Sequence, residues 1–175
     1  MGVFLLLILI IFLITVYVIV KNHNKYIFLG LGTSGLNVTK SWIQNGGKGF
    51  VLMENKDNKE KIEQFNTIST IIRRISKRKK YIIVSGLGGK TSNKMLLNLI
   101  QKLDEKKIQF KILAFLPFKL EGSIRNNQAI RIHKKLINRK NYHYIDIQKE
   151  LKKETTRELP ELFKKMDQKG LEMIV

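Results

Sequence analysis

The chain has 175 residues, no cysteine and a formal net charge of +19, from 33 Lys and Arg against 14 Asp and Glu. The absence of cysteine excludes a disulfide framework, a thiolate metal site and a cysteine nucleophile. No charged side chain lies in residues 1–20, so the charge belongs to the other 155 of the 175 residues, enough for one domain with its own core and too few for two.

The N-terminal segment predicts a membrane helix. Residues 3–20 form an uncharged run of 18 residues, and at 1.5 Å per residue this run nearly crosses a hydrocarbon core about 30 Å thick. No basic region precedes the run and no small-x-small cleavage site follows it, which argues against a cleaved signal peptide. The alternative is a buried core helix, but an all-round apolar helix would need a larger protein to bury it.

The orientation of this helix follows from the charges that flank it. Lys21, His23 and Lys25 come directly after the apolar run, whereas the other side offers only the α-amino group. The positive-inside rule then places the N-terminus outside and the following domain in the cytoplasm. We therefore expect a transmembrane helix over residues 1–22 and a single-pass membrane protein with a cytoplasmic domain over residues 25–175.

In that domain, short apolar runs alternate with segments of helical periodicity. Strands are predicted at residues 26–29, 50–53, 81–84, 108–116 and 142–147, and helices at residues 34–44, 59–76, 92–103, 123–137 and 159–174. Trp42 is an expected core residue of the first helix, and Ile130, Leu136 and Ile137 are expected core residues of the fourth. The alternation predicts an α/β fold, with a Rossmann-like parallel sheet and helices on both faces, preceded by one transmembrane helix.

The first glycine loop directly follows the first predicted strand. Residues 30–35 read Gly-Leu-Gly-Thr-Ser-Gly and match G-x-G-x-x-G between a strand and a helix. Glycine lets the backbone approach a phosphate, and the helix N-terminus supplies free N–H groups. Glu54 follows Gly30 by 24 residues, where a dinucleotide enzyme has an acid for the ribose. The loop alone therefore suggests a nicotinamide or flavin site, and a tight turn without a ligand is the alternative.

The second glycine loop, residues 85–92, reads Ser-Gly-Leu-Gly-Gly-Lys-Thr-Ser and again stands between a strand and a helix. It is not a Walker A motif, because the leading glycine of G-x-x-x-x-G-K-[ST] would fall on Val84. Two such turns at the carboxyl edge of one parallel sheet are able to hold two sides of one nucleotide, since backbone N–H groups and helix ends converge there.

Three segments together resemble the tubulin/FtsZ superfamily. Residues 85–92 look like its glycine-rich signature loop, and residues 117–125, Pro-Phe-Lys-Leu-Glu-Gly-Ser-Ile-Arg, look like the FtsZ segment P-F-x-x-E-G-x-x-R. Residues 30–37 resemble the FtsZ loop at the same place in the fold, including its closing asparagine. The three matches occur in the family's order and cover most of residues 25–147.

The resemblance implies a site for GTP or GDP, which Mg²⁺ could accompany. Residues implied near the phosphates and part of the base or ribose are Gly32, Thr33, Ser34, Gly35 and Asn37; those implied to cradle the phosphates are Gly88, Gly89, Lys90, Thr91 and Ser92. Glu121 would accept hydrogen bonds from the ribose hydroxyls, and Arg125 would approach the nucleotide. The alternative for this last pair is an i,i+4 ion pair at a helix start.

The departures from the family pattern limit the expected activity. Lys90, Ser92 and Lys94 replace glycines in the second loop, and nothing in residues 55–80 matches the loop that senses the γ-phosphate. The sequence contains neither the loop that acts on a neighbour's nucleotide nor the C-terminal activation domain. By resemblance we therefore expect weak or absent GTPase activity, no ordinary protofilament, and no assignable catalytic residue or protein-borne metal site.

The basic excess suggests a further partner. Residues 73–80 contain six Lys or Arg in eight positions, and Lys pairs recur further along the chain. These side chains are either solvated helix ends or a surface for anionic lipid, to which the membrane helix would hold the domain. No recognised nucleic-acid-binding module appears, so nucleic acid is not expected as a partner.

Three functions follow from these observations. The first is a membrane-anchored, FtsZ-like guanine-nucleotide-binding protein, acting as a binding or scaffold module in cell division or membrane remodelling, with self-association or a partner protein. The second is a membrane-bound Rossmann protein that binds an NAD-type dinucleotide. The third is a degenerate domain that binds no nucleotide and contacts lipid or protein.

Overall fold

The structure is a computed structural model, and it describes residues 4, 6–11, 13, 26–53, 62–153 and 159–174. Among these described residues, none of the helices combines the length and the apolar character needed to span a bilayer. Most of the segment expected to form a transmembrane helix, residues 1–22, lies outside the described residues. Membrane insertion of that segment therefore stays a prediction.

The described residues form a six-stranded sheet in which every neighbouring pair of strands is parallel. The strand order is β3-β2-β1-β4-β5-β6. The strands are β1 (Tyr26–Leu31), β2 (Lys48–Leu52), β3 (Gln64–Phe65), β4 (Lys80–Gly86), β5 (Phe110–Leu116) and β6 (Tyr142–Asp146). The chain winds outward from β1 in one direction and then from β4 in the other, so the order reverses between these two central strands.

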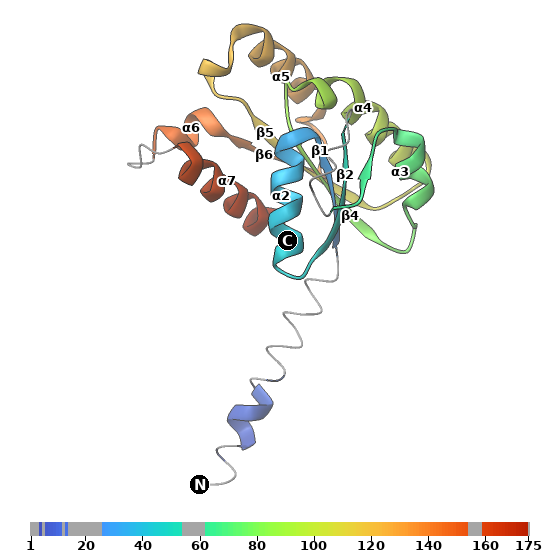
Figure 1. Cartoon of the computed structure of the whole chain (residues 1–175), viewed down its shortest axis with the longest axis vertical. Helices are drawn as coiled ribbons and strands as arrows, with labels where there is room; N and C mark the ends of the chain where they lie inside the picture. Colours follow the sequence, from blue (N-terminus) through green and yellow to red (C-terminus); the bar gives the residue numbers. More distant parts are fainter. Residues whose placement is uncertain are drawn as a thin grey trace.

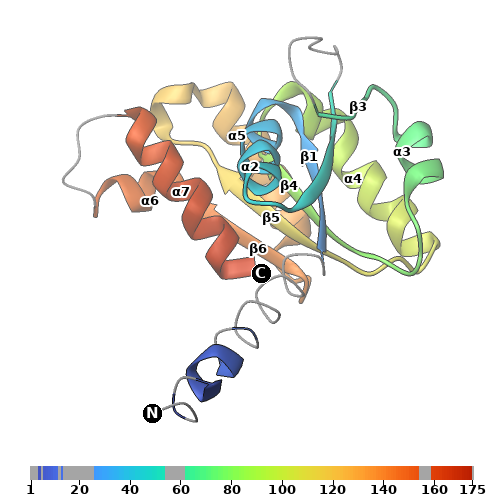
Figure 2. The same cartoon turned by 60° about the horizontal axis from the view of Figure 1, so that its bottom comes forward.

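Helices cover both faces of this sheet (Figures 1 and 2). On one face lie α3 (Ile68–Arg74), α4 (Lys90–Glu105) and α5 (Ser123–Leu136), and on the other lie α2 (Gly32–Gln44) and α7 (Leu159–Ile174). A single turn, η1 (Lys119–Glu121), precedes α5, and a short helix, α6 (Ile147–Leu151), follows β6. The predicted α/β fold with a covered parallel sheet is confirmed.

The core has two halves because side chains of each strand alternate between the faces. Ile83 of β4 packs into the cluster under α4, whereas Ile82 and Val84 pack into the cluster under α2 and α7. Trp42 is 3% exposed and stacks on Phe28, with 4.5 Å between ring centroids. The core role expected for Trp42 is therefore confirmed.

The helix predicted over residues 59–76 is wrong in its first half. The structure has the short strand β3 there and starts α3 only at Ile68, while residues 54–61 lie outside the described residues. Phe65 packs edge-on against Phe50 of β2, at 5.5 Å between centroids, and the Thr67 hydroxyl accepts a hydrogen bond from the Thr70 N–H as the N-cap of α3. The sequence pattern assigned Phe65 to a helical stripe, but pairing with β2 gives this residue its burial.

The core face predicted for the fourth helix was also partly wrong. Ile130 is 48% exposed and Ile137 is 43% exposed, and only Leu136 of the three expected residues is buried. The buried stripe of α5 instead runs through Ala129, Ile132 and Leu136. Ala129 was not predicted as a core residue because an alanine adds little to an apolar pattern.

Candidate functional site

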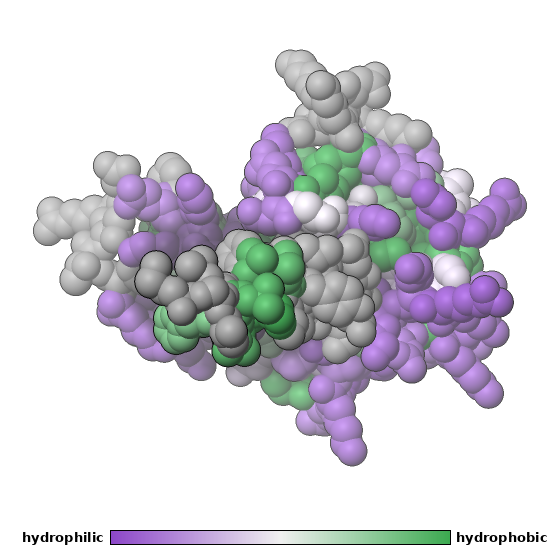
Figure 3. Space-filling model, turned by 90° about the horizontal axis from the view of Figure 1, so that it is seen from below, coloured by the Kyte–Doolittle hydropathy of each residue, from purple (hydrophilic) through white to green (hydrophobic). Residues whose placement is uncertain are grey.

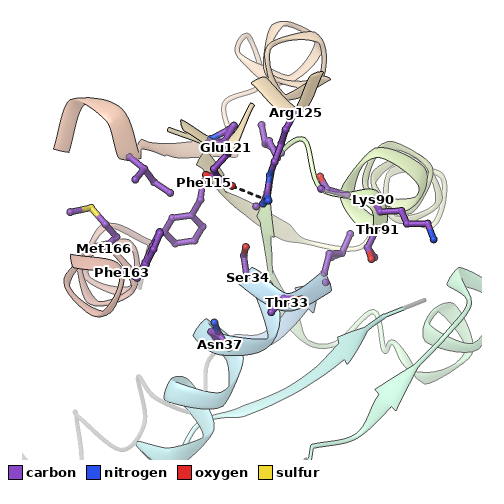
Figure 4. A pocket seen from close by; sticks show the side chains of 18 of the residues that line it. Thr33, Ser34, Asn37, Lys90, Thr91, Phe115, Glu121, Arg125, Phe163 and Met166 are labelled. Atoms are coloured by element: carbon purple, nitrogen blue, oxygen red, sulfur yellow. Dashed lines mark ion pairs between the residues drawn. The ribbon is translucent and has the colours of Figure 1, made fainter. Parts of the chain in front are cut away.

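A cavity of about 560 Å³ opens at the carboxyl edge of the sheet, beside the ends of β1 and β4. This is where the strand order reverses, and such a switch point is the usual ligand site of open α/β sheets. Figure 4 shows that side chains from α2, α4, the β5–α5 segment and α7 surround it. The lining residues are Leu31, Gly32, Thr33, Ser34, Asn37, Gly86, Leu87, Gly89, Lys90, Thr91, Ser92, Phe115, Pro117, Glu121, Arg125, Ile147, Phe163, Met166 and Asp167.

The first glycine loop forms one wall of this cavity. Gly32 has φ of +66°, a left-handed conformation that lets β1 pass directly into α2. Thr33, Ser34 and Asn37 of the first turns of α2 then line the cavity. Gly35 is not a lining residue, because its Cα faces the sheet: a Cβ there would lie 2.6 Å from the Val84 carbonyl oxygen. The loop therefore presents the start of α2 to the cavity.

The second glycine loop forms the opposite wall. Gly88 has φ of +78° and packs against the Arg125 backbone, without lining the cavity. Gly89 is the N-cap of α4 and Leu31 is the N-cap of α2, and neither of these two residues makes a side-chain capping hydrogen bond. Two helix N-termini whose N-cap residues supply no side-chain cap therefore converge on one cavity, which is an arrangement suited to an anion.

One buried polar group of the second loop that belongs to a lining residue of the cavity has no partner. Ser92 is 2% exposed, and its hydroxyl makes no hydrogen bond within the described part of the chain. A buried hydroxyl left unpaired costs about 1–3 kcal/mol, so such a group calls for a partner such as a ligand, a water molecule or an ion. The Ser92 hydroxyl lies at the helix N-terminus that faces the cavity, where a ligand oxygen would satisfy it.

The Glu121–Arg125 pair closes the top of the cavity. The two side chains form the i,i+4 ion pair considered above, with 2.9 Å between Arg125 Nη1 and Glu121 Oε2 (Figure 4). Glu121 Oε1 also accepts a hydrogen bond of 3.1 Å from the Phe118 N–H. Each carboxylate oxygen has two lone pairs, so Glu121 keeps acceptor capacity for a ligand hydroxyl. The ion pair and a ligand-binding role are therefore compatible.

The side of the cavity formed by α7 was missed from the sequence. Phe163, Met166 and Asp167 line it, although they lie far along the chain from both glycine loops. Burial raises the pKa of the Asp167 carboxyl to about 6. A signal was present in the sequence, because Asp167 interrupts the otherwise apolar stripe of Leu162, Phe163 and Met166. A lone carboxylate on the buried face of a helix indicates a binding role more often than an exposed one does.

The structure thus brings ten of the twelve predicted site residues to one cavity: Gly32, Thr33, Ser34, Asn37, Gly89, Lys90, Thr91, Ser92, Glu121 and Arg125. Gly35 and Gly88 lie behind its walls and shape the two loops. Glu54, the ribose ligand of the dinucleotide alternative, lies outside the described residues. No group of three or more His, Asp or Glu side chains among the described residues is placed to hold a metal ion.

The comparisons with known proteins identify the fold. No protein-family model matches the chain, and no curated protein matches it in sequence. Solved structures do match. An empty FtsZ dimer from M. jannaschii has a TM-score of 0.70 at 16% identity, over 84% of this chain and 52% of that one.

Two further matches lie in the same group of proteins. CetZ from Methanosaeta thermophila has a TM-score of 0.62 at 15% identity, over 82% of this chain and 51% of that one. The phage tubulin PhuZ, in a structure with GDP, has a TM-score of 0.60 at 16% identity, over 83% and 54%. The chain therefore has a tubulin/FtsZ-like fold, as its three motifs predicted, and it spans about half the length of these proteins.

Proposed function

We propose that the chain binds a guanine nucleotide, GTP or GDP, in the cavity at the carboxyl edge of the sheet. The observation that carries the proposal is the convergence on one cavity of the unpaired Ser92 hydroxyl and of two helix N-termini whose N-cap residues make no side-chain cap. A carboxylate, that of Asp167 on α7, also lines this cavity. The tubulin/FtsZ-like fold supports the same assignment, and PhuZ is a protein of that fold seen with GDP.

The cavity offers a place for each part of the nucleotide. Its volume of about 560 Å³ lies within the usual range for small-molecule sites. The phosphates belong at the starts of α2 and α4, where N–H groups and the helix dipoles favour negative charge. The ribose hydroxyls belong beside Glu121, which has acceptor capacity remaining. The base then reaches α7.

The chemistry of Asp167 favours guanine over adenine. Guanine presents two adjacent donors, N1–H and the exocyclic N2 amine, to which the two oxygens of a carboxylate are complementary. Adenine presents an acceptor at N1, which a carboxylate repels. Phe163 lies one helical turn before Asp167 and offers its ring to the flat face of the base. We therefore assign base selection to α7.

We also propose a location and an activity for the protein. The uncharged run over residues 3–20 supports membrane anchoring, and the basic residues that follow it support a cytoplasmic domain. The fold, which an FtsZ dimer shares, supports self-association or a partner protein, in a binding or scaffold module that would serve cell division or membrane remodelling. Mg²⁺ would be held mainly by the phosphates and water, which is its usual coordination beside a nucleotide. Turnover of GTP is expected to be weak.

A dinucleotide site is the second candidate, because the strand order with β1 and β4 at its centre is also that of dinucleotide-binding folds.

Titration of the full chain in detergent micelles with labelled GTP, GDP, ATP and NADH separates the guanine-nucleotide site from the dinucleotide site. We expect guanine nucleotides to bind and Glu121→Ala to weaken them about tenfold, since a charged hydrogen bond contributes about 1.5–3 kcal/mol. Glu172→Ala, at an exposed position of α7, is the control and should bind normally. NADH binding that ignores Glu121 would favour the second candidate, and no binding of any nucleotide would exclude both.

Removal of the unpaired Ser92 hydroxyl should weaken GTP binding without lowering the stability of the unliganded chain. Ser92→Ala should leave the thermal midpoint of the unliganded chain unchanged or slightly higher, because the lost hydroxyl has no partner. The same change should weaken GTP on the order of tenfold. Ser85→Ala is the matched control, since Ser85 is also buried and unpaired in the described structure but does not line the cavity. Equal GTP affinities of both variants would contradict the proposed phosphate site.

A further inference from the structure

We propose that the amino edge of the sheet, opposite the nucleotide cavity, is a docking face for a bilayer that contains anionic lipid. The amino edge is defined here by the loops that precede β2, β4, β5 and β6 together with the first residues of β2 and β4, which gives residues 45–48, 75–80, 106–109 and 137–141. This surface has no lining residue of the nucleotide cavity. The proposal therefore stands or fails independently of nucleotide binding.

The amino edge is basic without any acidic residue in its loops. Because all strands are parallel, their first residues gather at this one edge of the sheet. The four loops contain nine basic residues and no Asp or Glu: Lys48, Lys77, Arg78, Lys79, Lys80, Lys106, Lys107, Arg139 and Lys140. Arg139 is half-buried and paired with Asp104 at 2.9 Å, and the other eight are exposed. The view from below in Figure 3 shows hydrophilic side chains projecting from this side of the molecule.

The carboxyl edge does not share this imbalance. At that edge the loop over residues 86–89 is uncharged, and acidic side chains accompany most of the cations: Glu121 pairs with Arg125, Asp146 with Lys149 and Glu150 with Lys153. The positive charge of the domain is thus distributed unevenly between the two edges. A surface with one sign of charge and exposed lysine side chains is suited to a field of anionic headgroups.

The topology connects this basic edge to the uncharged N-terminal run. β1 is a central strand, and its first residue, Tyr26, is in register with Lys80 of β4, while Ile27 is in register with Lys48 of β2. The chain that precedes Tyr26 therefore joins the sheet in the middle of the basic edge. That preceding chain includes the uncharged run over residues 3–20. An apolar run of bilayer length and a basic edge that adjoin in this way favour a lipid surface over nucleic acid.

Stabilisation of helix ends explains only part of these charges. Helices on a parallel sheet end at its amino edge, and cations near a helix C-terminus are favourable. Lys106 is the C-cap of α4 and fits that explanation. Lys48 and Lys80, however, are the first residues of strands β2 and β4, beyond any helix end. Helix ends therefore do not account for these two charges, which lipid phosphates would complement.

Docking at this face would point the nucleotide cavity away from the bilayer. The central strands have six or seven residues, which at about 3.3 Å per residue separates the two edges by roughly 20 Å. This separation exceeds the Debye length of about 8 Å at physiological ionic strength. Nucleotide affinity should therefore not depend on the charge of the lipid, which keeps the two proposals experimentally distinct.

Hydrogen exchange of the full chain in nanodiscs tests the docking face. One set of discs contains phosphatidylcholine alone, and the other contains phosphatidylserine in addition. We expect slower exchange in residues 75–80, 106–109 and 137–141 with the anionic discs only, and no change in residues 86–89. Raising the salt concentration should reverse the protection, because exposed charges are screened.

Charge variants complete the test. Each lysine near an anionic surface contributes roughly fivefold to association, about 1 kcal/mol, so the triple variant Lys77→Gln, Lys79→Gln, Lys106→Gln should lose docking on the order of a hundredfold. Its exchange would then return to the rate in neutral discs. Lys119→Gln with Lys152→Gln, exposed at the carboxyl edge, is the control and should dock normally. Identical exchange in both kinds of disc would overturn the proposal, as would protection by an RNA oligonucleotide in neutral discs without any by phosphatidylserine.

Discussion

Replacing Asp167 by asparagine should reverse the base preference of the cavity. The variant loses the carboxylate that accepts from guanine N1–H and N2, so GTP affinity should fall on the order of a hundredfold, since each hydrogen bond to a charged group contributes about 1.5–3 kcal/mol. Xanthosine triphosphate should gain affinity, because xanthine has a carbonyl where guanine has its amine, and the asparagine amide can donate to it. Competition between the two labelled nucleotides measures the reversal.

The same residue predicts how binding depends on pH. Burial raises the pKa of Asp167 to about 6, and a protonated carboxyl can no longer accept both hydrogen bonds. GTP affinity should therefore fall as the pH drops through 6, and the Asp167→Asn variant should lack this dependence.

The stability of the unliganded chain should depend on pH in the opposite direction. The pKa of Asp167 in the folded chain lies above the unfolded value of 3.8, so this residue makes the fold less stable as the pH rises from about 4 to 6. Asp167→Asn should accordingly raise the thermal midpoint at neutral pH.

The control for both experiments lies on the same helix. Glu161→Gln removes a carboxylate from an exposed position of α7 that does not line the cavity. This variant should keep the GTP affinity, the pH dependence and the thermal midpoint of the parent. A preference for GTP that survives Asp167→Asn would exclude α7 as the element that selects the base.

The site residues that the sequence predicted all lie in short motifs of consecutive residues. Gly32 and Ser92 each belong to a loop between a strand and a helix, and parallel strands bring such loops to one edge. For Asp167 the sequence shows a carboxylate in an apolar stripe, but not the cavity that this carboxylate lines. α7 reaches the cavity only because it packs across the face that α2 also covers, and such a long-range packing choice leaves little trace in local periodicity.

The errors in the fold have a related cause. Phe65 and Ile68 fit a helical spacing, yet the structure places Phe65 in β3 and Ile68 in α3. Periodicity reports that a residue is buried, but it does not report which neighbour buries it. The Thr67 cap between the two was the local signal that a helix begins there. A cap residue such as Thr67 therefore indicates where a helix begins, even inside an uninterrupted apolar stripe.

A single methyl group at Gly35 should have a large effect on stability. In Gly35→Ala the new Cβ would lie 2.6 Å from the Val84 carbonyl oxygen and 2.7 Å from Gly30 Cα, which are backbone atoms of two central strands. These atoms cannot move without disturbing the sheet, so we expect a loss of about 3 kcal/mol or more, seen as a large drop in the thermal midpoint or failure to fold. Gly46→Ala is the matched control: its φ is +84°, but no described atom lies within 4 Å of the added Cβ. Strain alone should destabilise it by about 1–2 kcal/mol.

This pair of variants also decides how much the glycine motif says about function. Gly30 and Gly35 are required because β1 and α2 approach each other closely, since a Cβ on Gly30 would lie 2.3 Å from the Gly35 oxygen. Gly32 is required by its positive φ. All three reasons hold with or without a nucleotide, so the fold itself needs this motif. If Gly35→Ala destabilises the unliganded chain as expected, the motif is no proof of binding. The weight of the functional assignment then rests on Ser92 and Asp167, whose side chains the unliganded fold does not need.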